Sequence, residues 1–382
     1  MLYRKLGTTG LDVSILGFGC MRLPVLDGRQ DLIDEPVATE MLHYAIENGV
    51  NYVDTAFPYH GTSRTEPGAS EAFVGRALSG GYRERVMLAT KLPSWLVETR
   101  ADMDRFLDGQ LERLRTDHLG FYLLHGLNAA SWEKLLGLGV LEFLDEAKAD
   151  GRIGHAAFSF HDDYDALPPI VDAYDWAFCQ LQYNYLDVDE QAGTRGVRYA
   201  ADRGIGVVVM EPLKGGRLAG AQPADVRAVW ERAAQPRPAY QWALRFVWDD
   251  PGVSMLLSGM STMQHVVDNV AAAQSGVASS LTSEELALID EVRAVYRARI
   301  RADCTGCKYC MPCPSRIDIP GVLALLNKAS MFDDVAGAKA ANSASLLARA
   351  ATCSRCGTCE ALCPQQLGIR ELLDEAVDLM CE

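Results

Sequence analysis

Short apolar segments alternate with longer amphipathic segments through the first three hundred residues of the chain. Eight of the short segments are rich in Val, Leu or Ile and predict parallel strands, because a strand buried on both faces reads as a continuous apolar run. They are Ile15–Gly19, Tyr52–Thr55, Val86–Thr90, Leu119–Leu124, His155–Ser159, Phe178–Gln182, Gly206–Met210 and Ser254–Ser258. A β-hairpin of Tyr3–Leu6 and Val13–Leu16 is predicted before them.

The segments between the strands show the periodicity of helices. We expect helices at Pro36–Asn48, Ser70–Ser79, Thr99–Leu114, Ser131–Ala149 and Ala224–Ala233, with a further one at Ser283–Arg299. Eight strand–helix units in about 280 residues predict an α/β fold of the (β/α)8 TIM barrel type. A doubly wound sheet is the competing architecture, but Gly17-Phe18-Gly19 lacks the third glycine of a dinucleotide-binding fingerprint.

Cysteine use divides the chain near residue 300, because nine of the eleven cysteines follow Arg301. Eight of them form two runs, each closed by a proline: Cys304, Cys307, Cys310 and Cys313, then Cys353, Cys356, Cys359 and Cys363. The second run has the bacterial [4Fe–4S] spacing, and the first is one residue shorter before its last cysteine. The pattern favours two [4Fe–4S] clusters over zinc, which also accepts Cys-x2-Cys pairs.

The fourth cysteine of such a run commonly serves the other cluster. We therefore predict one cluster on Cys304, Cys307, Cys310 and Cys363, and a second on Cys353, Cys356, Cys359 and Cys313. Helices are expected at Ile319–Ala329, Ala340–Ala351 and Glu371–Met380, so the tail resembles an α-helical ferredoxin. The predicted domains are a barrel at 1–299 and a small ferredoxin-like domain at 300–382.

The charge of the chain excludes some partners. With 51 acidic and 36 basic residues the net charge is −15, which argues against nucleic acid and anionic lipid as partners. The apolar stretches are shorter than the roughly 20 residues that span a bilayer. The N-terminus lacks the apolar core of a signal peptide, and we expect a cytoplasmic protein.

Polar side chains stand at the ends of consecutive predicted strands. Asp54, Lys91 and His125 close the second, third and fourth strands, and Tyr59 follows Asp54 by five residues. The carboxyl ends of barrel strands meet at one mouth, where active sites lie. Taken singly, each residue has an ordinary structural explanation.

Together these four residues form a proton donor with its tuning groups. An ammonium beside a phenol stabilises the phenolate and lowers the phenol pKa from its usual value near 10. Asp54 would keep Lys91 charged and oriented. His125 would position a carbonyl oxygen or assist proton transfer from Tyr59.

With these residues in place, the first 295 residues resemble an aldo-keto reductase, and the fusion to the tail resembles an iron–sulfur branch of that family. The motifs are Gly-Phe-Gly-Cys-Met-Arg-Leu-Pro at 17–24, Val-Asp-Thr-Ala-Phe-Pro-Tyr at 53–59, Thr-Lys-Leu at 90–92, Leu-Leu-His at 123–125, Gly-Arg-Ile-Gly-His-Ala-Ala-Phe-Ser at 151–159, Gln-Leu-Gln-Tyr-Asn at 180–184, Met-Glu-Pro-Leu-Lys-Gly-Gly-Arg-Leu at 210–218 and Gly-Met-Ser-Thr-Met-Gln-His-Val-Val-Asp-Asn at 259–269. The resemblance implies NAD(P)H bound at the barrel mouth and reversible reduction of an aldehyde or ketone. It also implies that Asp54, Tyr59, Lys91 and His125 are the catalytic tetrad.

The same resemblance implies the residues that bind the cofactor. They are Met21, Ser159, Gln180, Pro212, Leu213, Gly215, Arg217, Gly259, Ser261, His265, Asp268 and Asn269. Ser159 and Gln180 match positions that hold the carboxamide, while the Gly259–Asn269 segment matches the adenosine site. Where relatives carry a basic pair for a 2′-phosphate, this chain has Gly259 and His265, which leaves NAD and NADP both open.

The expected enzyme is an NAD(P)H-dependent reductase of a small carbonyl compound, or the alcohol dehydrogenase of the reverse direction. The alternative is an electron-transfer protein that couples the clusters to a nucleotide or a redox partner protein. A nicotinamide gives two electrons as hydride, whereas a cluster passes one at a time, so a structural role for the clusters is equally open. Trp95, His60, Phe57 and His161 are candidates for lining the substrate pocket.

Overall fold

The structure is a computed structural model that describes residues 1–304, 306–339 and 343–381. Its contacts divide the chain into two compact units. The first comprises residues 1–219 and 238–281, and the second comprises residues 220–237 and 282–382. The boundary expected at 299/300 rests on cysteine content and stays a prediction, whereas by contacts the helices at 224–230 and 283–298 belong with the tail.

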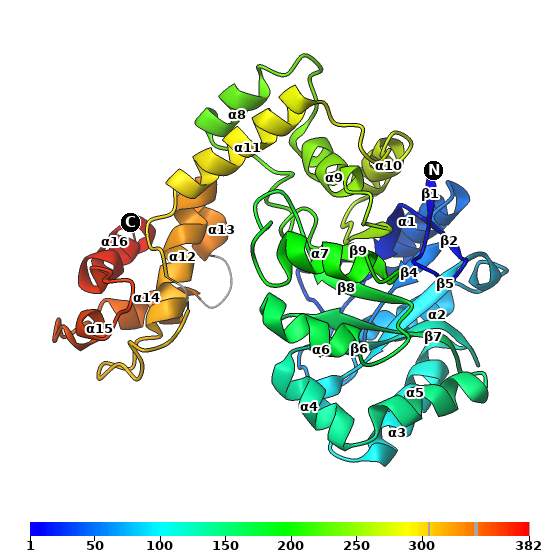
Figure 1. Ribbon diagram of the computed structural model, residues 1–382. Helices are drawn as coiled ribbons and strands as arrows, with labels where there is room; N and C mark the ends of the chain where they lie inside the picture. Colours follow the sequence, from blue (N-terminus) through cyan, green and yellow to red (C-terminus); the bar gives the residue numbers. More distant parts are fainter. Residues whose placement is uncertain (305, 340–342, 382) are drawn as a thin grey trace. The chain divides into compact units, whose positions relative to one another are not determined.

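The first unit contains a closed barrel of parallel strands in the order β10-β3-β4-β5-β6-β7-β8-β9 (Figure 1). The strands are β3 (Leu16–Gly19), β4 (Tyr52–Asp54), β5 (Met87–Leu92), β6 (Leu119–Leu127), β7 (Ile153–Phe160), β8 (Phe178–Gln182), β9 (Gly206–Met210) and β10 (Met255–Ser258). All eight predicted strands are present, and the barrel fold is confirmed.

The N-terminal hairpin packs against the inside of the barrel. Strands β1 (Tyr3–Lys5) and β2 (Asp12–Ser14) pair antiparallel. Leu6 and Val13 are fully buried in the same cluster as Phe121 and Phe178 of the barrel interior. Gly7 has a φ of +51°, and an added Cβ would lie 2.4 Å from the Gly204 carbonyl oxygen, so the turn requires glycine here.

Helices surround the barrel and bury their apolar faces on the outside of the strands. They are α1 (Glu35–Glu47), α2 (Ala69–Ala77), α3 (Arg100–Leu114), α4 (Ala129–Gly137), α5 (Val140–Ala149), α6 (Leu167–Val171), α7 (Gly193–Ala201), α9 (Ala239–Asp249) and α10 (Met263–Ala272), with short 3₁₀ helices η1 (Arg83–Arg85), η2 (Ser94–Leu96) and η3 (Tyr164–Ala166).

The helix expected at Ser131–Ala149 is two helices, and the single-helix prediction is wrong. The break falls at Leu138 and Gly139, between α4 and α5. Gly139 adopts a φ of +76°, a left-handed conformation that a helix cannot contain. The apolar periodicity continues on both sides of the break, which is why the pattern alone read as one helix.

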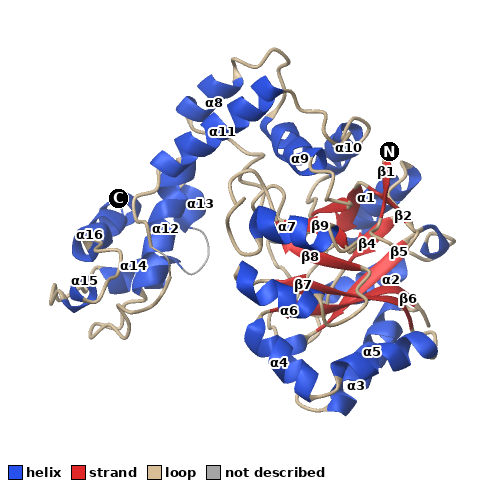
Figure 2. Cartoon of the chain, viewed as in Figure 1, coloured by secondary structure: helices blue, strands red, loops and turns tan. Residues whose placement is uncertain are grey.

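The second unit is built of helices and loops in the part of the tail that the structure describes (Figure 2). Its helices are α8 (Ala224–Trp230), α11 (Ser283–Ala298), α12 (Ile319–Phe332), α13 (Val335–Lys339), α14 (Ser343–Ala350), α15 (Thr358–Ala361) and α16 (Ile369–Cys381). The helix expected at Ala340–Ala351 begins three residues earlier than α14, and residues 340–342 lie outside the described part. Buried side chains of α12, α14 and α16 form the core, which also contains Ile317 and Ala302.

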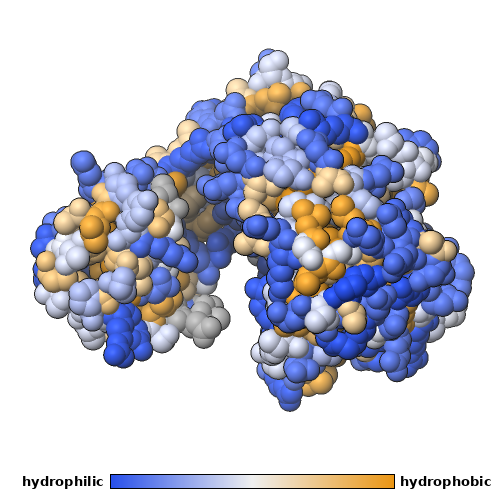
Figure 3. All heavy atoms as spheres, turned by 60° about the horizontal axis from the view of Figure 1, so that its bottom comes forward, coloured by the Kyte–Doolittle hydropathy of each residue, from blue (hydrophilic) through white to orange (hydrophobic). Residues whose placement is uncertain are grey.

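On the face drawn in Figure 3, hydrophilic residues predominate over both units, and hydrophobic residues form scattered groups. Across the described residues, none of the helices combines the length and the apolar content that a membrane crossing requires.

Candidate functional site

The ammonium of Lys91 lies inside the barrel and is bonded to Asp54. Lys91 is on β5 and Asp54 ends the neighbouring strand β4. The Lys91 Nζ lies 2.7 Å from each carboxylate oxygen of Asp54 and 2.9 Å from the Thr55 carbonyl oxygen. Both side chains are buried, with exposed fractions of 0% and 3%, so the two charges form an ion pair that is shielded from water.

The phenol of Tyr59 and the imidazole of His125 complete the group. Lys91 Nζ donates to the Tyr59 hydroxyl oxygen at 3.2 Å. The ring of His125, on β6, lies 6.0 Å from the Tyr59 ring in an edge-on arrangement. His125 Nδ1 is buried and has no hydrogen-bond partner among the described residues. The four residues predicted from the strand ends therefore lie around one point at the barrel mouth.

Burial governs the protonation of the phenol and the imidazole. Burial raises the pKa of Tyr59 above its usual value, and the nearby Lys91 ammonium offsets only part of that rise. The net lowering of the phenol pKa expected from Lys91 is therefore not seen, since desolvation is the larger effect. Burial and the Lys91 charge hold the pKa of His125 well below 6.5. At neutral pH the site has a protonated phenol beside a neutral imidazole.

The ion pair itself keeps its charges. Burial opposes the ammonium of Lys91, but the Asp54 carboxylate and the Tyr59 phenol outweigh it and raise the pKa of Lys91. Burial raises the pKa of Asp54, and the Lys91 charge works against that rise. An ammonium with a raised pKa beside an acceptor carboxylate stays positive at neutral pH, so the phenol has a fixed cation next to it.

A buried polar network behind β5 was missed by the sequence analysis. The Glu71 carboxylate of α2 is fully buried and accepts hydrogen bonds from Thr90 and Gln110, each at 2.6 Å. Arg113 donates to the same carboxylate at 2.8 Å. Gln110 Nε2 also donates to the Lys91 carbonyl oxygen at 3.0 Å, so the network fixes the backbone that carries Lys91.

The predicted carboxamide-binding pair lies on adjacent strands. Ser159 of β7 and Gln180 of β8 are paired in register. Ser159 Oγ accepts from the Gly126 amide at 2.8 Å. Gln180 Nε2 lies 3.5 Å from the Met210 sulfur, while its Oε1 is buried without a partner among the described residues. A buried unpartnered amide oxygen has the chemistry to accept from a ligand N–H.

The predicted loop after β9 has a backbone of unusual conformation. Positive φ angles occur at Glu211, Lys214, Gly215 and Gly216. Lys214 bonds to Asp187 at 2.5 Å, and Asn184 bonds to Asp187 and to the Glu211 carbonyl oxygen. Pro212, Leu213 and Arg217 belong to this loop. The Lys214 ammonium is therefore paired with the Asp187 carboxylate. Gly215 and Gly216 have no side chains, so a ligand can approach their backbone amides closely.

The predicted adenosine segment, Gly259–Asn269, follows β10 directly and continues into the first turns of α10. Gly259 and Ser261 are exposed, and the Ser261 amide donates to His265 Nδ1 at 3.4 Å. Asp268 accepts from Gln264 at 2.8 Å. Asn269 is buried and donates to Ser258 Oγ, so the structure shows an internal anchor at that position. Met21, in the loop after β3, is half exposed.

Two of the four aromatic candidates for the pocket lie beside the tetrad. The Trp95 ring lies 5.2 Å from the His125 ring. His161 lies near Gly126 and bonds to Gln191 at 3.2 Å. In contrast, His60 is bonded on both ring nitrogens, to the Leu23 amide and the Gln30 carbonyl oxygen.

Phe57, the fourth candidate, is buried and packs edge-on against Phe106 at 5.5 Å. Its ring belongs to the packing between the β4 loop and α3. His60 and Phe57 therefore hold loops in place instead of facing the tetrad.

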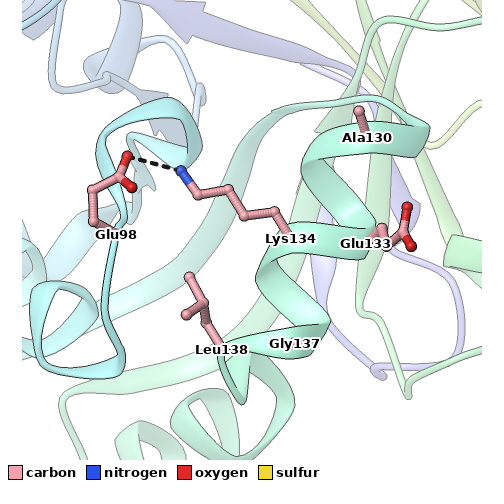
Figure 4. A pocket seen from close by; sticks show the side chains of 6 residues that line it. All are labelled: Glu98, Ala130, Glu133, Lys134, Gly137 and Leu138. Carbon is pink, nitrogen blue, oxygen red and sulfur yellow. Dashed lines mark hydrogen bonds and ion pairs between the residues drawn. The ribbon is translucent and has the colours of Figure 1, made fainter.

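A surface pocket of about 560 Å³ lies away from the tetrad, between η2 and α4 (Figure 4). Its lining residues are Glu98, Ala130, Glu133, Lys134, Gly137 and Leu138. Lys134 pairs with Glu98 at 3.0 Å across the pocket. None of the predicted site residues lines it.

The cysteines of the tail surround two cavities in the second unit. Cys304, Cys307, Cys310 and Cys363 line one cavity. Cys313, Cys353, Cys356 and Cys359 line the other, which Cys310 also borders. Within the described residues, no three His, Cys, Asp or Glu side chains come together closely enough to hold a single metal ion. Four thiols border the first cavity and five border the second, with Cys310 common to both. Thiols spread around a space are a donor set that suits an iron–sulfur cluster.

Comparison with known proteins finds a matching family for each of the two parts of the chain. Residues 15–294 match the aldo/keto reductase family, and residues 303–368 match the 4Fe-4S dicluster domain family. The uncharacterized oxidoreductase YrpG of Bacillus subtilis is 30% identical over 237 residues, which cover 58% of this chain and 69% of YrpG.

Solved structures support the fold. The holo form of the aldo-keto reductase AKR11C1 from Bacillus halodurans has a TM-score of 0.62 at 27% identity and covers 76% of this chain and 96% of its own. An aldo-keto reductase from Klebsiella pneumoniae in complex with NADPH has a TM-score of 0.60 at 25% identity, covering 77% and 96%.

Proposed function

Because this chain belongs to the aldo/keto reductase family, with a 4Fe-4S dicluster domain after the barrel, we propose that it reduces an aldehyde or ketone to an alcohol with NAD(P)H at the Tyr59 phenol. The observation that carries this proposal is the position of the Lys91 ammonium, which bridges the Asp54 carboxylate and the Tyr59 hydroxyl inside the barrel. The reverse reaction, oxidation of the alcohol, uses the same groups.

The residues at the barrel mouth fit a nicotinamide cofactor, which would supply a hydride to the carbonyl carbon. Gln180 Oε1, buried and unpartnered, would accept from the carboxamide, and Ser159 lies beside it. Gly215 of the β9 loop would approach the pyrophosphate through its backbone amide. His265 is the basic side chain at the segment matched to the adenosine, so both NADH and NADPH are candidates.

Tyr59 would act as the general acid. Its hydroxyl donates a proton to the carbonyl oxygen as the carbon accepts hydride, which leaves a phenolate beside Lys91. The ammonium of Lys91 stabilises that phenolate, and Asp54 holds the ammonium in place. His125 is neutral at working pH and would orient the carbonyl oxygen instead of carrying a charge.

The test is a pair of Tyr-to-Phe variants. Tyr59→Phe should lower kcat for carbonyl reduction by at least a thousandfold while the dissociation constant for NAD(P)H changes little, because the general acid is lost and the cofactor contacts are kept. Tyr52→Phe is the matched control: it removes a buried hydroxyl from β4 that has no partner among the described residues, and activity should be retained. Full activity of Tyr59→Phe would reject the proposal.

We propose two [4Fe–4S] clusters in the tail, one in each of the two cysteine-lined cavities. We also propose a cytoplasmic location, because reducing conditions there keep cysteines as free thiols that can bind a cluster. Cys307 of the first run and Cys356 of the second are exposed, which would bring both clusters to the surface of the unit and favours exchange of electrons with a partner protein.

This second role, electron transfer, has its own test. Under anaerobic conditions NADH or NADPH is added to the purified protein, and the cluster absorbance is followed together with alcohol formation. Bleaching of the clusters without carbonyl turnover would favour a redox-coupling protein over a reductase. Carbonyl turnover with unchanged cluster absorbance would assign the clusters another role.

A further inference from the structure

One charged side chain at the barrel mouth has a position that the tetrad does not explain. Arg64 lies in the loop between Tyr59 and α2, and its guanidinium carbon lies 4.4 Å above the Trp95 ring. The Trp95 indole N–H donates to the Arg64 carbonyl oxygen at 3.0 Å. The Trp95 indole therefore stabilises the loop that carries Arg64, and stacking on the indole orders the Arg64 guanidinium.

The guanidinium of Arg64 has no carboxylate partner within residues 1–304, 306–339 and 343–381. Two other arginines of the barrel unit differ: Arg22 pairs with Glu211, and Arg105 pairs with Asp102. Glu66, two residues away, is exposed and borders a separate groove with Phe57 and Arg113. The donor fork of Arg64 is thus exposed and available at the site.

Trp95 links Arg64 to the reactive end of the site. Burial is the main cause of the lowered pKa of His125 and of His161, and the Arg64 charge adds a smaller lowering to both. His125 in turn lies 5.2 Å from Trp95 and 6.0 Å from Tyr59, centre to centre. The rings of Tyr59, His125 and Trp95 therefore lie in sequence between the proposed reaction centre and the exposed Arg64 guanidinium.

On the basis of the proposed function, we propose that Arg64 and Trp95 select carbonyl substrates that carry a carboxylate at the end remote from the reacting carbonyl. The carbonyl oxygen would lie at Tyr59, a flat or extended body would lie along Trp95, and the carboxylate would accept two hydrogen bonds from the Arg64 fork. In a chain of net charge −15, an anionic substrate needs such a local cation to approach the mouth.

The test compares two benzaldehydes that differ only at the para group, 4-carboxybenzaldehyde and its neutral methyl ester, methyl 4-formylbenzoate. For the full-length protein we expect kcat/KM to be at least tenfold higher for the carboxylate, and the ratio to fall as salt rises. Arg64→Ala should lower that ratio about tenfold or more. Arg64→Lys should keep part of it, because a point charge replaces the fork.

The matched control is Arg203→Ala. Arg203 also stacks on an aromatic ring, that of Tyr199 at 3.5 Å, but it precedes β9 at the opposite end of the barrel. This variant should leave the ratio unchanged. Equal kcat/KM for the two aldehydes in the parent protein, or an unchanged ratio in Arg64→Ala, would overturn the inference while leaving the reductase proposal in place.

A binding measurement separates the two proposals. Calorimetry of 4-carboxybenzaldehyde with the Tyr59→Phe variant loaded with NADP⁺ or NAD⁺ reports recognition without turnover. Tight binding that is lost in the Tyr59→Phe/Arg64→Ala variant supports the Arg64 site even if no aldehyde is reduced. Binding that does not depend on Arg64 contradicts it.

Discussion

At the scale of single residues, the buried ammonium of Lys91 is the feature on which the site depends. Each of its acceptors, the Asp54 carboxylate, the Thr55 carbonyl and the Tyr59 hydroxyl, comes from β4 or the loop after it. Burying an ion pair costs solvation, which the attraction between the partners and their hydrogen bonds must offset. Removing either partner leaves the other buried without compensation.

We therefore expect strong coupling between these two residues. Lys91→Met should destabilise the fold by about 3–5 kcal/mol, whereas Lys91→Met combined with Asp54→Asn should cost much less than the sum of the single changes. Urea unfolding followed by tryptophan fluorescence measures this, since five of the six tryptophans lie in the barrel unit. The exposed pair Lys5–Asp12 is the control, with coupling near zero. Additive effects at Lys91 and Asp54 would contradict the expectation.

The pH dependence of reduction follows from the protonation of Tyr59 and His125. A general acid works while it is protonated, and burial raises the pKa of Tyr59, so reduction should fall only above about pH 10. His125 has a pKa well below 6.5 and stays neutral above that value. We predict a flat profile of kcat/KM between about pH 7 and 9.

The control for this profile is His125→Gln, which should lower kcat/KM without introducing a new titration. A rising limb near pH 6.5 that disappears in His125→Gln would show instead that a charged imidazole takes part. Alcohol oxidation should rise toward high pH, because that direction needs the phenolate of Tyr59.

The tetrad was predictable from sequence because parallel strands bring their carboxyl ends together, so that residues one strand–helix unit apart must meet. Glu71 and Arg64 were not predictable in this way. Glu71 looks like an ordinary exposed helix residue until α2 is placed against α3, and Arg64 is one polar residue in a loop. Their roles depend on contacts with Gln110 and Trp95 that only the fold brings about.

At the scale of elements, the break between α4 and α5 shows where periodicity stops being informative. Two glycines lie two residues apart, Gly137 at the end of α4 and Gly139 before α5. Gly137 has no neighbouring atom within 4 Å of an added Cβ and no positive φ. Gly139 has a φ of +76°. The same amino acid thus has opposite conformational requirements at the two positions.

Substituting alanine at each position tests this difference. Gly139→Ala should destabilise the barrel by about 1–2 kcal/mol, because a Cβ penalises the left-handed conformation. Gly137→Ala should be neutral or slightly stabilising, because alanine favours the helix. The urea midpoints of the two variants measure the difference. Equal midpoints would mean that the break does not need a left-handed residue.

The strands were predicted closely because a strand buried on both faces leaves a continuous apolar run, and β8 and β9 have the predicted ends. The Ser131–Ala149 helix failed because its glycines do not interrupt the apolar face. The sequence pattern predicted a helix at α8 but could not place it against α11, because the two helices are more than fifty residues apart in the chain. The ion pair between Glu291 of α11 and Arg232, which follows α8, shows such a long-range contact.

At the scale of the whole molecule, the chain joins two kinds of redox chemistry. In the proposed function, the barrel would supply a proton donor for a two-electron reduction, and the cysteine-rich unit would supply ligands for one-electron centres. The two cavities share Cys310 at their borders, so the clusters would lie next to each other within the second unit. Residues from both runs form each cavity, which ties the two ends of the tail together.

This crossing of ligands, expected from the spacing of the two cysteine runs, gives a prediction about single cysteine variants. Cys363 lines the cavity of the first run, and Cys313 lines the cavity of the second. Cys363→Ser should therefore perturb the same cluster as Cys304→Ser, and Cys313→Ser should perturb the same cluster as Cys353→Ser. Electron paramagnetic resonance of the dithionite-reduced proteins, with iron and sulfide analysis, identifies the cluster that remains in each variant.

The controls are Cys20→Ser and Cys179→Ser, which change buried cysteines of the barrel unit and should leave both cluster signals intact. If each run held its own cluster, Cys363→Ser would instead resemble Cys353→Ser. That result would contradict the crossed arrangement while leaving the count of two clusters in place. Loss of both signals in every cysteine variant of the tail would mean that the two clusters fold the unit together, because each cavity then depends on the other for its fourth ligand.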